Sequence, residues 1–70
     1  MKRRPVNSSN LASVGYDPTS QILEIEFNTG TIYQYFDVPQ SEHIALLGAS
    51  SHGSYFYHHI RDSYRYQRIH

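Results

Sequence analysis

The chain is 70 residues long, its basic and acidic residues balance to zero net charge, and it contains no cysteine. This length allows a single domain with a small core, and the lack of cysteine excludes disulfides, thiolate metal sites and a cysteine nucleophile. The longest apolar run, "IALL", is too short to span a membrane, and the first residues, "MKRRPVNSS", lack the apolar stretch of a secretory signal. We therefore expect a cytoplasmic protein with no membrane partner.

The charges are segregated along the chain. Residues 1–16 carry basic but no acidic side chains, residues 17–42 carry acidic but no basic ones, and residues 43–70 carry arginines against a single aspartate. Zero net charge argues against strong non-specific binding to phosphate. Two interpretations remain open: a solvated acidic hairpin with basic ends, or two basic ends that converge on one surface.

Three consecutive strands are predicted from alternating apolar and polar residues. They are "LASVGYD" (11–17), "QILEIEF" (21–27) and "TIYQYF" (31–36). The turn "DPTS" joins the first two strands, and the loop "NTG" closes a hairpin between the second and third.

The loop "NTG" sets the register of the hairpin. A three-residue loop ending in a left-handed Gly30 pairs Ile25 with Tyr33 and Leu23 with Tyr35. A two-residue loop would instead bury the glutamine between the tyrosines, at a cost of about 1–3 kcal/mol for an unpaired amide. We therefore predict Tyr33 and Tyr35 as structural core residues with their hydroxyls at the rim, rather than as an exposed platform for bases.

The opposite face of the hairpin is predicted to be open to solvent. It carries Ile22, Glu24, Glu26, Ile32, Gln34 and Phe36. We interpret the two glutamates as a solvated strand surface rather than a catalytic pair. The apolar residues beside them suit a contact with a protein or with a second copy of the chain.

A helix is predicted over residues 40–49. Val38 precedes a proline and therefore avoids the α region, which suits it as the N-cap with Pro39 as the first helical residue. Asp37 and Ser41 are the alternative caps. Ile44 and Leu47 lie on one stripe of this helix and are predicted to face the core.

A second, shorter helix is predicted over residues 55–62, capped by Ser54. Its Phe56 and Ile60 are four residues apart and are expected to face the core. Residues 64–69 alternate in the manner of a strand and form either a fourth strand or an ordered arm. The expected fold is thus a single α+β domain over residues 1–70, with a small antiparallel sheet of three or four strands, two helices packed on one face, and residues 1–5 flexible.

No pattern in the sequence indicates a reaction. The five histidines lack the spacing of a metal site, and the adjacent His58 and His59 point in different directions on a helix. The serines and histidines form no recognisable triad. We expect no catalytic residues, no metal and no cofactor.

The C-terminal stretch "IRDSYRYQRI" is the best candidate for a binding site. It interleaves three arginines with two tyrosines: Arg61, Tyr64, Arg65, Tyr66 and Arg68. Single-stranded RNA is bound by this combination, because guanidinium groups meet phosphates and aromatic rings stack on bases. In the alternative interpretation, the tyrosines close the core and the arginines pair with acidic residues of the hairpin.

Three stretches, "VNSSNLASVGYD", "YQYFDVP" and "GSYFYHHIRDSYRYQRI", together resemble the KTSC domain. This is a short bacterial module that occurs alone and at the C-terminus of some lysyl-tRNA synthetases. The resemblance covers nearly the whole chain, and its most recognisable mark is the Tyr-x-Tyr of residues 33–35 followed by Val38-Pro39. Where the family pattern has Tyr-Phe-Asn, this chain has Tyr-Phe-Tyr at residues 55–57, so a role of that asparagine does not carry over.

The association with a synthetase implies RNA as a ligand of the family. We therefore expect a small non-enzymatic binding module whose partner is single-stranded or structured RNA. The alternative is a protein-interaction or dimerisation module that uses the open face of the sheet.

Overall fold

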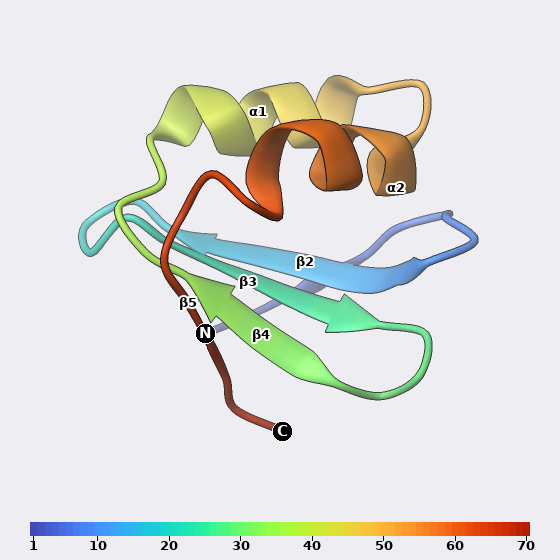
Figure 1. Cartoon of the computed structure of the whole chain (residues 1–70), viewed down its shortest axis with the longest axis horizontal. Helices are drawn as coiled ribbons and strands as arrows, with labels where there is room; N and C mark the ends of the chain where they lie inside the picture. The colour runs from blue at the N-terminus through green and yellow to red at the C-terminus, as the bar shows by residue number, and fades with distance from the viewer.

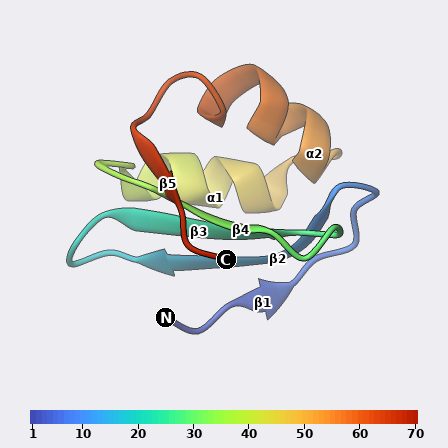
Figure 2. The ribbon, with the colours of Figure 1, turned by 60° about the horizontal axis from the view of Figure 1, so that its bottom comes forward.

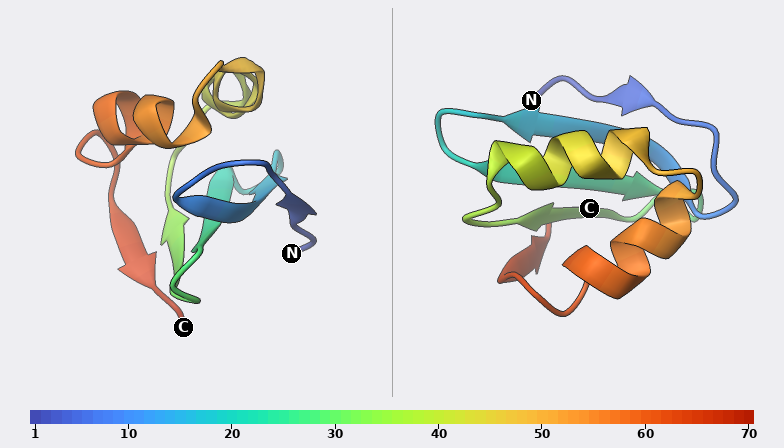
Figure 3. Two further views of the ribbon diagram at one scale, coloured as in Figure 1. Left: turned by 90° about the vertical axis from the view of Figure 1, so that its right-hand side faces the viewer. Right: turned by 90° about the horizontal axis from the view of Figure 1, so that it is seen from above.

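In the computed structural model, which describes residues 1–70, an antiparallel sheet is covered on one face by helices (Figure 1). The sheet has five strands in sequential order: β1 (Arg4–Pro5), β2 (Leu11–Asp17), β3 (Ile22–Phe27), β4 (Ile32–Tyr35) and β5 (Tyr66–Arg68). The helices are α1 (Gln40–Gly48) and α2 (His52–Tyr55), which continues into the π-helical turn η1 (Phe56–Ile60). Seen from above, both helical segments lie over the same side of the sheet (Figure 3). The α+β class and the placement of the helices are thus confirmed.

The predicted number of strands is wrong because of the N-terminal segment. Residues 4–5, which were expected to belong to a flexible arm, form the edge strand β1, where Arg4 pairs with Val14 and Pro5 with Ser13 of β2. A strand of two residues leaves no alternating pattern in the sequence. Proline is tolerated there because an edge strand can leave one backbone position without a donor.

The register of the central hairpin is confirmed. Ile25 pairs with Tyr33 and Leu23 with Tyr35, and the backbone N–H of Phe27 donates to the carbonyl of Thr31 at 2.9 Å. Gly30 has a φ of +93°, the left-handed conformation that the loop requires. The pattern of the strands and the chemistry of the turn therefore agree.

The core lies between the sheet and the helices, and the predicted core face of α1 is only partly right. Leu47 packs against the core as predicted and Leu46 is fully buried, whereas Ile44 is 61% exposed. The predicted cap is also wrong: Pro39 is the N-cap, with an extended ψ of 152°, and Val38 is buried in the core. Because the helix begins after Pro39 and Val38 anchors its entry, this connection decides which side of α1 meets the sheet.

The second helical segment begins earlier than predicted. Its N-cap is Ser51, whose Oγ accepts a hydrogen bond from the backbone N–H of Ser54 at 3.2 Å. Phe56 and Ile60 are buried as expected. The following residues return to the sheet, and residues 66–68 form a true strand rather than an arm, with Tyr66 opposite Tyr35 of β4.

The two basic ends do not converge, because β1 and β5 lie at opposite edges of the sheet. The N-terminal segment instead runs on the side of the sheet away from the helices (Figure 2). There the Arg3 guanidinium pairs with the carboxylate of Glu24 and donates to Ser13 Oγ at 2.9 Å. Glu24 is only 4% exposed, so the expected solvated surface is wrong at this position. The apolar Ile22, Ile32 and Phe36 of this face are half-buried.

No helix of the structure combines the length and the apolar character that crossing a bilayer would need.

Candidate functional site

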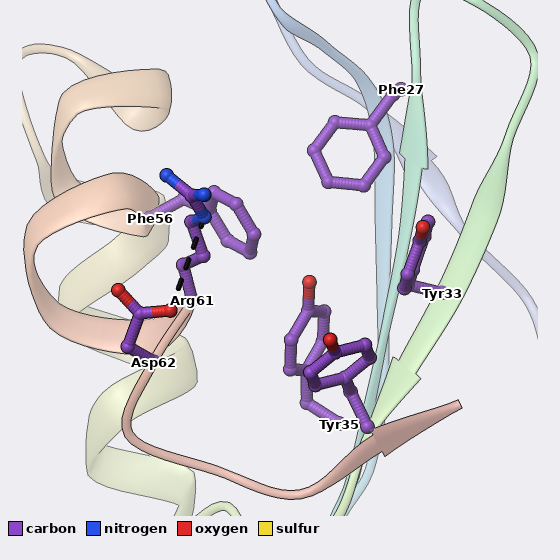
Figure 4. A pocket seen from close by; sticks show the side chains of 7 residues that line it. Phe27, Tyr33, Tyr35, Phe56, Arg61 and Asp62 are labelled. Atoms are coloured by element: carbon purple, nitrogen blue, oxygen red, sulfur yellow. Dashed lines mark ion pairs between the residues drawn. The ribbon is translucent and has the colours of Figure 1, made fainter. Parts of the chain in front are cut away.

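A cleft opens between the second helical segment and the strands at the β5 edge of the sheet. Its volume is about 390 Å³. We call it the aromatic cleft, and it is lined by Phe27, Tyr33, Tyr35, Phe56, Arg61, Asp62 and Tyr66. Figure 4 shows the charged pair on the helix side and the tyrosines on the side of the sheet.

The tyrosine side of the cleft follows from the pairing of β4 with β5. Tyr33 and Tyr35 are two residues apart on β4, so both side chains leave the sheet on the same face. Tyr66 lies directly opposite Tyr35, and its ring centroid is 5.7 Å from that of Tyr33 and 5.8 Å from that of Tyr35. Three rings contributed by two strands therefore form one continuous layer.

Phenylalanines close the rear of the cleft. Phe27 leaves the end of β3 on the same face as the tyrosines, and its ring meets that of Phe56 from η1 in an edge-to-face contact with centroids 5.3 Å apart. Phe56 also meets Tyr35 edge-to-face at 5.5 Å. These contacts hold the helix against the end of the hairpin.

Exposure increases across the tyrosine layer. Tyr35 is 3% exposed and belongs to the core, Tyr33 is half-buried, and Tyr66 is 59% exposed. Burial raises the pKa of the Tyr35 phenol, so this hydroxyl stays neutral. Tyr66 instead offers its ring to any molecule that enters the cleft.

One arginine lines the cleft, and a second leaves the sheet on the same face. The Arg61 guanidinium lies 5.0 Å from the centre of the Tyr57 ring and 4.0 Å from the carboxylate of Asp62. Both charged side chains are largely exposed, so this ion pair is weak and leaves Arg61 able to bind an anion. Arg68 lies directly opposite Tyr33 in the sheet, so its side chain leaves on the face of the cleft.

The five C-terminal residues predicted to bind RNA are divided by the structure. Arg61 and Tyr66 line the cleft, whereas Tyr64 and Arg65 do not. Arg68 leaves the sheet on the same face but does not line the cleft, and its Nε donates to the carbonyl of His70 at 3.1 Å. The Tyr64 hydroxyl donates to Glu42 at 2.8 Å, and burial together with this hydrogen bond raises the pKa of Tyr64 to about 12. Tyr64 therefore has the structural role that the alternative interpretation gave it.

Arg65 also has the role of the alternative interpretation, in which the arginines pair with acidic residues. Its guanidinium pairs with Asp37 at 3.1 Å and lies 5.5 Å from the centre of the Phe36 ring, on the side of β4 away from the cleft. Sequence reasoning also missed Phe27 and Phe56 as lining residues. The hairpin register already placed Phe27 beside Tyr33, and Phe56 was predicted to face the core, but the sequence does not show at which point of the sheet its helix docks.

Comparisons with known proteins agree with this fold. The model of the KTSC domain matches residues 7–64. An uncharacterized protein of Stutzerimonas stutzeri is 49% identical over 70 residues, covering 99% of each chain. A lysine–tRNA ligase of Nostoc sp. is 41% identical over 54 residues, which are 77% of this chain but 10% of the ligase. The crystal structure of a KTSC domain protein from Yersinia pestis superposes with a TM-score of 0.96 at 38% identity, covering 99% of this chain and 97% of that one. The chain therefore belongs to the KTSC domain family.

Proposed function

We propose that this KTSC domain is a non-enzymatic module that binds single-stranded RNA through the aromatic cleft. The observation that carries the proposal is the exposed ring of Tyr66 beside the half-buried ring of Tyr33, with Arg61 and Arg68 on the same side of the sheet. Aromatic rings stack on bases whatever their sequence, and guanidinium groups meet the phosphates that link them.

The size of the cleft supports a nucleotide as the unit that is bound. Sites for small molecules measure about 300–1,000 Å³, and the cleft, at about 390 Å³, is at the lower end of this range. It suits one base with its sugar better than a folded RNA surface. The similarity to a segment of a lysine–tRNA ligase, an enzyme whose name includes an RNA substrate, also supports RNA as the ligand class. The domain would meet such a ligand in the cytoplasm.

Binding of this kind depends only modestly on salt. The two arginines on this side of the sheet would neutralise about two phosphates, so the logarithm of the affinity should fall against the logarithm of salt concentration with a slope of roughly −1.4. The zero net charge of the chain adds no general attraction to nucleic acid.

The test is an NMR titration of the labelled domain with short mixed-sequence single-stranded RNAs at low salt. We expect amide shifts around the cleft. Tyr66→Ala should weaken binding by about 1–3 kcal/mol, as removal of a stacking ring does, whereas Tyr66→Phe should retain it. Arg68→Ala should weaken binding, and Arg65→Ala, a matched arginine on the other side, should not. If millimolar RNA shifts no amide around the cleft, the proposal is wrong.

A protein contact on the opposite face of the sheet is the rival proposal. It has less support, because the Arg3–Glu24 pair and the N-terminal segment lie on that face. If RNA shifts only amides on that opposite face, the proposal that RNA binds at the aromatic cleft is also wrong.

A further inference from the structure

A second pocket adjoins the aromatic cleft at the end of the central hairpin. Its volume is about 280 Å³. We call it the amide pocket, and the residues that matter for its chemistry are Asn10, Asn28, Gly53 and Tyr57. Phe27 and Phe56 line both pockets, and their rings are in contact. The two pockets therefore adjoin on either side of one pair of rings, and we call them together the groove.

The amide pocket offers a side-chain amide that can both donate and accept a hydrogen bond. The amide group of Asn10 is exposed and has no hydrogen-bond partner within the protein, although its backbone is well held. The Asn10 N–H donates to Ser8 Oγ at 3.2 Å, and the Asn10 carbonyl accepts from the N–H of Asn28 at 2.9 Å. The side-chain amide of Asn28 is already used, because it donates to the carbonyl of Ser9 at 2.8 Å. Asn10 thus provides both a donor and an acceptor from a fixed position.

Gly53 makes room for this amide. A Cβ atom at position 53 would lie 3.2 Å from Asn10 Nδ2, closer than such contacts usually are. Any side chain there would crowd the Asn10 amide or fill the pocket.

Arg61 connects the two pockets. Its guanidinium lines the aromatic cleft and at the same time lies over the ring of Tyr57, which lines the amide pocket. A positive charge at the junction of two adjacent sites is placed to meet a phosphate that links their occupants.

We infer that the groove binds two consecutive nucleotides of single-stranded RNA. One base stacks against Tyr33 and Tyr66 in the aromatic cleft, and the neighbouring nucleotide lies in the amide pocket, where Asn10 hydrogen-bonds to it. The Phe27–Phe56 ring pair separates the two bases, so they are splayed apart as in many complexes with unstacked RNA. Arg61 pairs with the phosphate between them. This inference rests on the proposed function and specifies the length of RNA that the site holds.

The test compares ribonucleoside 5′-monophosphates with mixed-sequence pools of ribodinucleotides and ribotrinucleotides in NMR titrations of the whole chain. Dinucleotides should bind more tightly than monophosphates by about tenfold, which is close to the contribution of one hydrogen bond to a charged group. A trinucleotide can occupy a two-nucleotide site in two ways, so it should bind about twofold more tightly than a dinucleotide on statistical grounds. It should show no further gain.

Variants separate the contribution of each pocket. Asn10→Ala should weaken dinucleotide binding by about threefold to tenfold, as expected for a lost hydrogen bond, and leave monophosphate binding unchanged. Asn7→Ala is the matched control, because Asn7 is an exposed amide in the same loop and lines neither pocket. Arg61→Met should remove most of the advantage of dinucleotides, and Gly53→Ala should act like Asn10→Ala.

The outcomes distinguish this inference from the proposed function. Equal binding of monophosphates and dinucleotides, with Asn10→Ala silent, would overturn the two-nucleotide groove and leave RNA binding at the aromatic cleft intact. Absence of binding by every RNA would overturn both. Each variant is first compared with the unmodified chain by its amide spectrum, so that a loss of folding is not read as a loss of binding.

Discussion

Replacing Arg3 by methionine should destabilise the fold by about 1–3 kcal/mol at neutral pH. Double-mutant cycles give about 0.2–1 kcal/mol for exposed ion pairs, whereas breaking a buried pair costs about 3–5 kcal/mol. The pair here lies between these limits, because 6% of the Glu24 side chain and 26% of the Arg3 side chain are accessible. Methionine keeps much of the apolar stem that lies over Gly15, and Gln34 still donates to Glu24 at 2.8 Å, so the variant loses mainly the charge and the hydrogen bond to Ser13 Oγ.

The cost should shrink in acid. Burial raises the pKa of Glu24, but the hydrogen bonds from Gln34 and Arg3 outweigh this, so the pKa lies below its ordinary value of 4.5. A carboxyl with a lowered pKa in the folded state stabilises the fold above its unfolded pKa, and this contribution is lost as the pH falls through the folded pKa. In the variant without Arg3, burial raises the pKa of Glu24 with less to oppose it. Protonation of Glu24 in acid then removes the buried negative charge, so the variant loses less stability relative to the unmodified chain.

Urea denaturation of both proteins, at neutral pH and well below pH 4.5, measures this change. Lys2→Met is the matched control, because it removes one N-terminal positive charge that has no ion-pair partner in the structure. If Arg3→Met costs no more than Lys2→Met, or if its cost is the same at both pH values, the buried ion pair does not stabilise the fold as argued.

Three further predictions concern the stability of the fold. Gly15→Ala should cost about 1–3 kcal/mol, because its Cβ would lie 2.8 Å from the carbonyl oxygen of Lys2, and thermal melts should show most of that cost disappear when residues 1–3 are deleted. Tyr35→Ala should cost about 3–5 kcal/mol in urea denaturation, as loss of a buried aromatic ring does, and a cost below 1 kcal/mol would place the ring outside the core. Tyr64→Phe should lose about 0.5–1.5 kcal/mol of stability with its hydrogen bond to Glu42, while RNA titrations should show unchanged affinity.

Local patterns predicted the hairpin because two independent signals agreed there. The apolar alternation of β3 and the left-handed Gly30 both favour the register that places Tyr33 and Tyr35 over the core. The helix face was predicted less well, because α1 has only nine residues and its apolar stripe is weak. Its orientation is set by the anchoring of Val38, which only the folded structure shows.

The outer face of the sheet was misjudged for a different reason. Glu24 has the alternation of a solvated strand residue. Arg3, which covers it, lies just before a two-residue strand, and this segment has no pattern of its own. At the candidate site, Tyr64 and Tyr66 share a periodicity but not an environment. Tyr66 lies within β5, whereas Tyr64 precedes the strand and reaches Glu42 on α1. The alternation of a strand predicts the direction of a side chain only within the strand itself, and Tyr64 lies before β5 begins.

The two edge strands also bear on how the domain behaves at high concentration. An exposed sheet edge is a template on which the strand of another molecule can add, and long, flat, uncharged edges are the most susceptible. Here β1 has two residues and includes Pro5, which has no backbone N–H to donate. The other edge strand, β5, has three residues; Arg65 precedes it and Arg68 is its last residue. A neighbouring chain would find few backbone groups to pair with and would meet positive charge. The domain should therefore resist edge-to-edge aggregation while leaving the aromatic cleft open beside one of these edges.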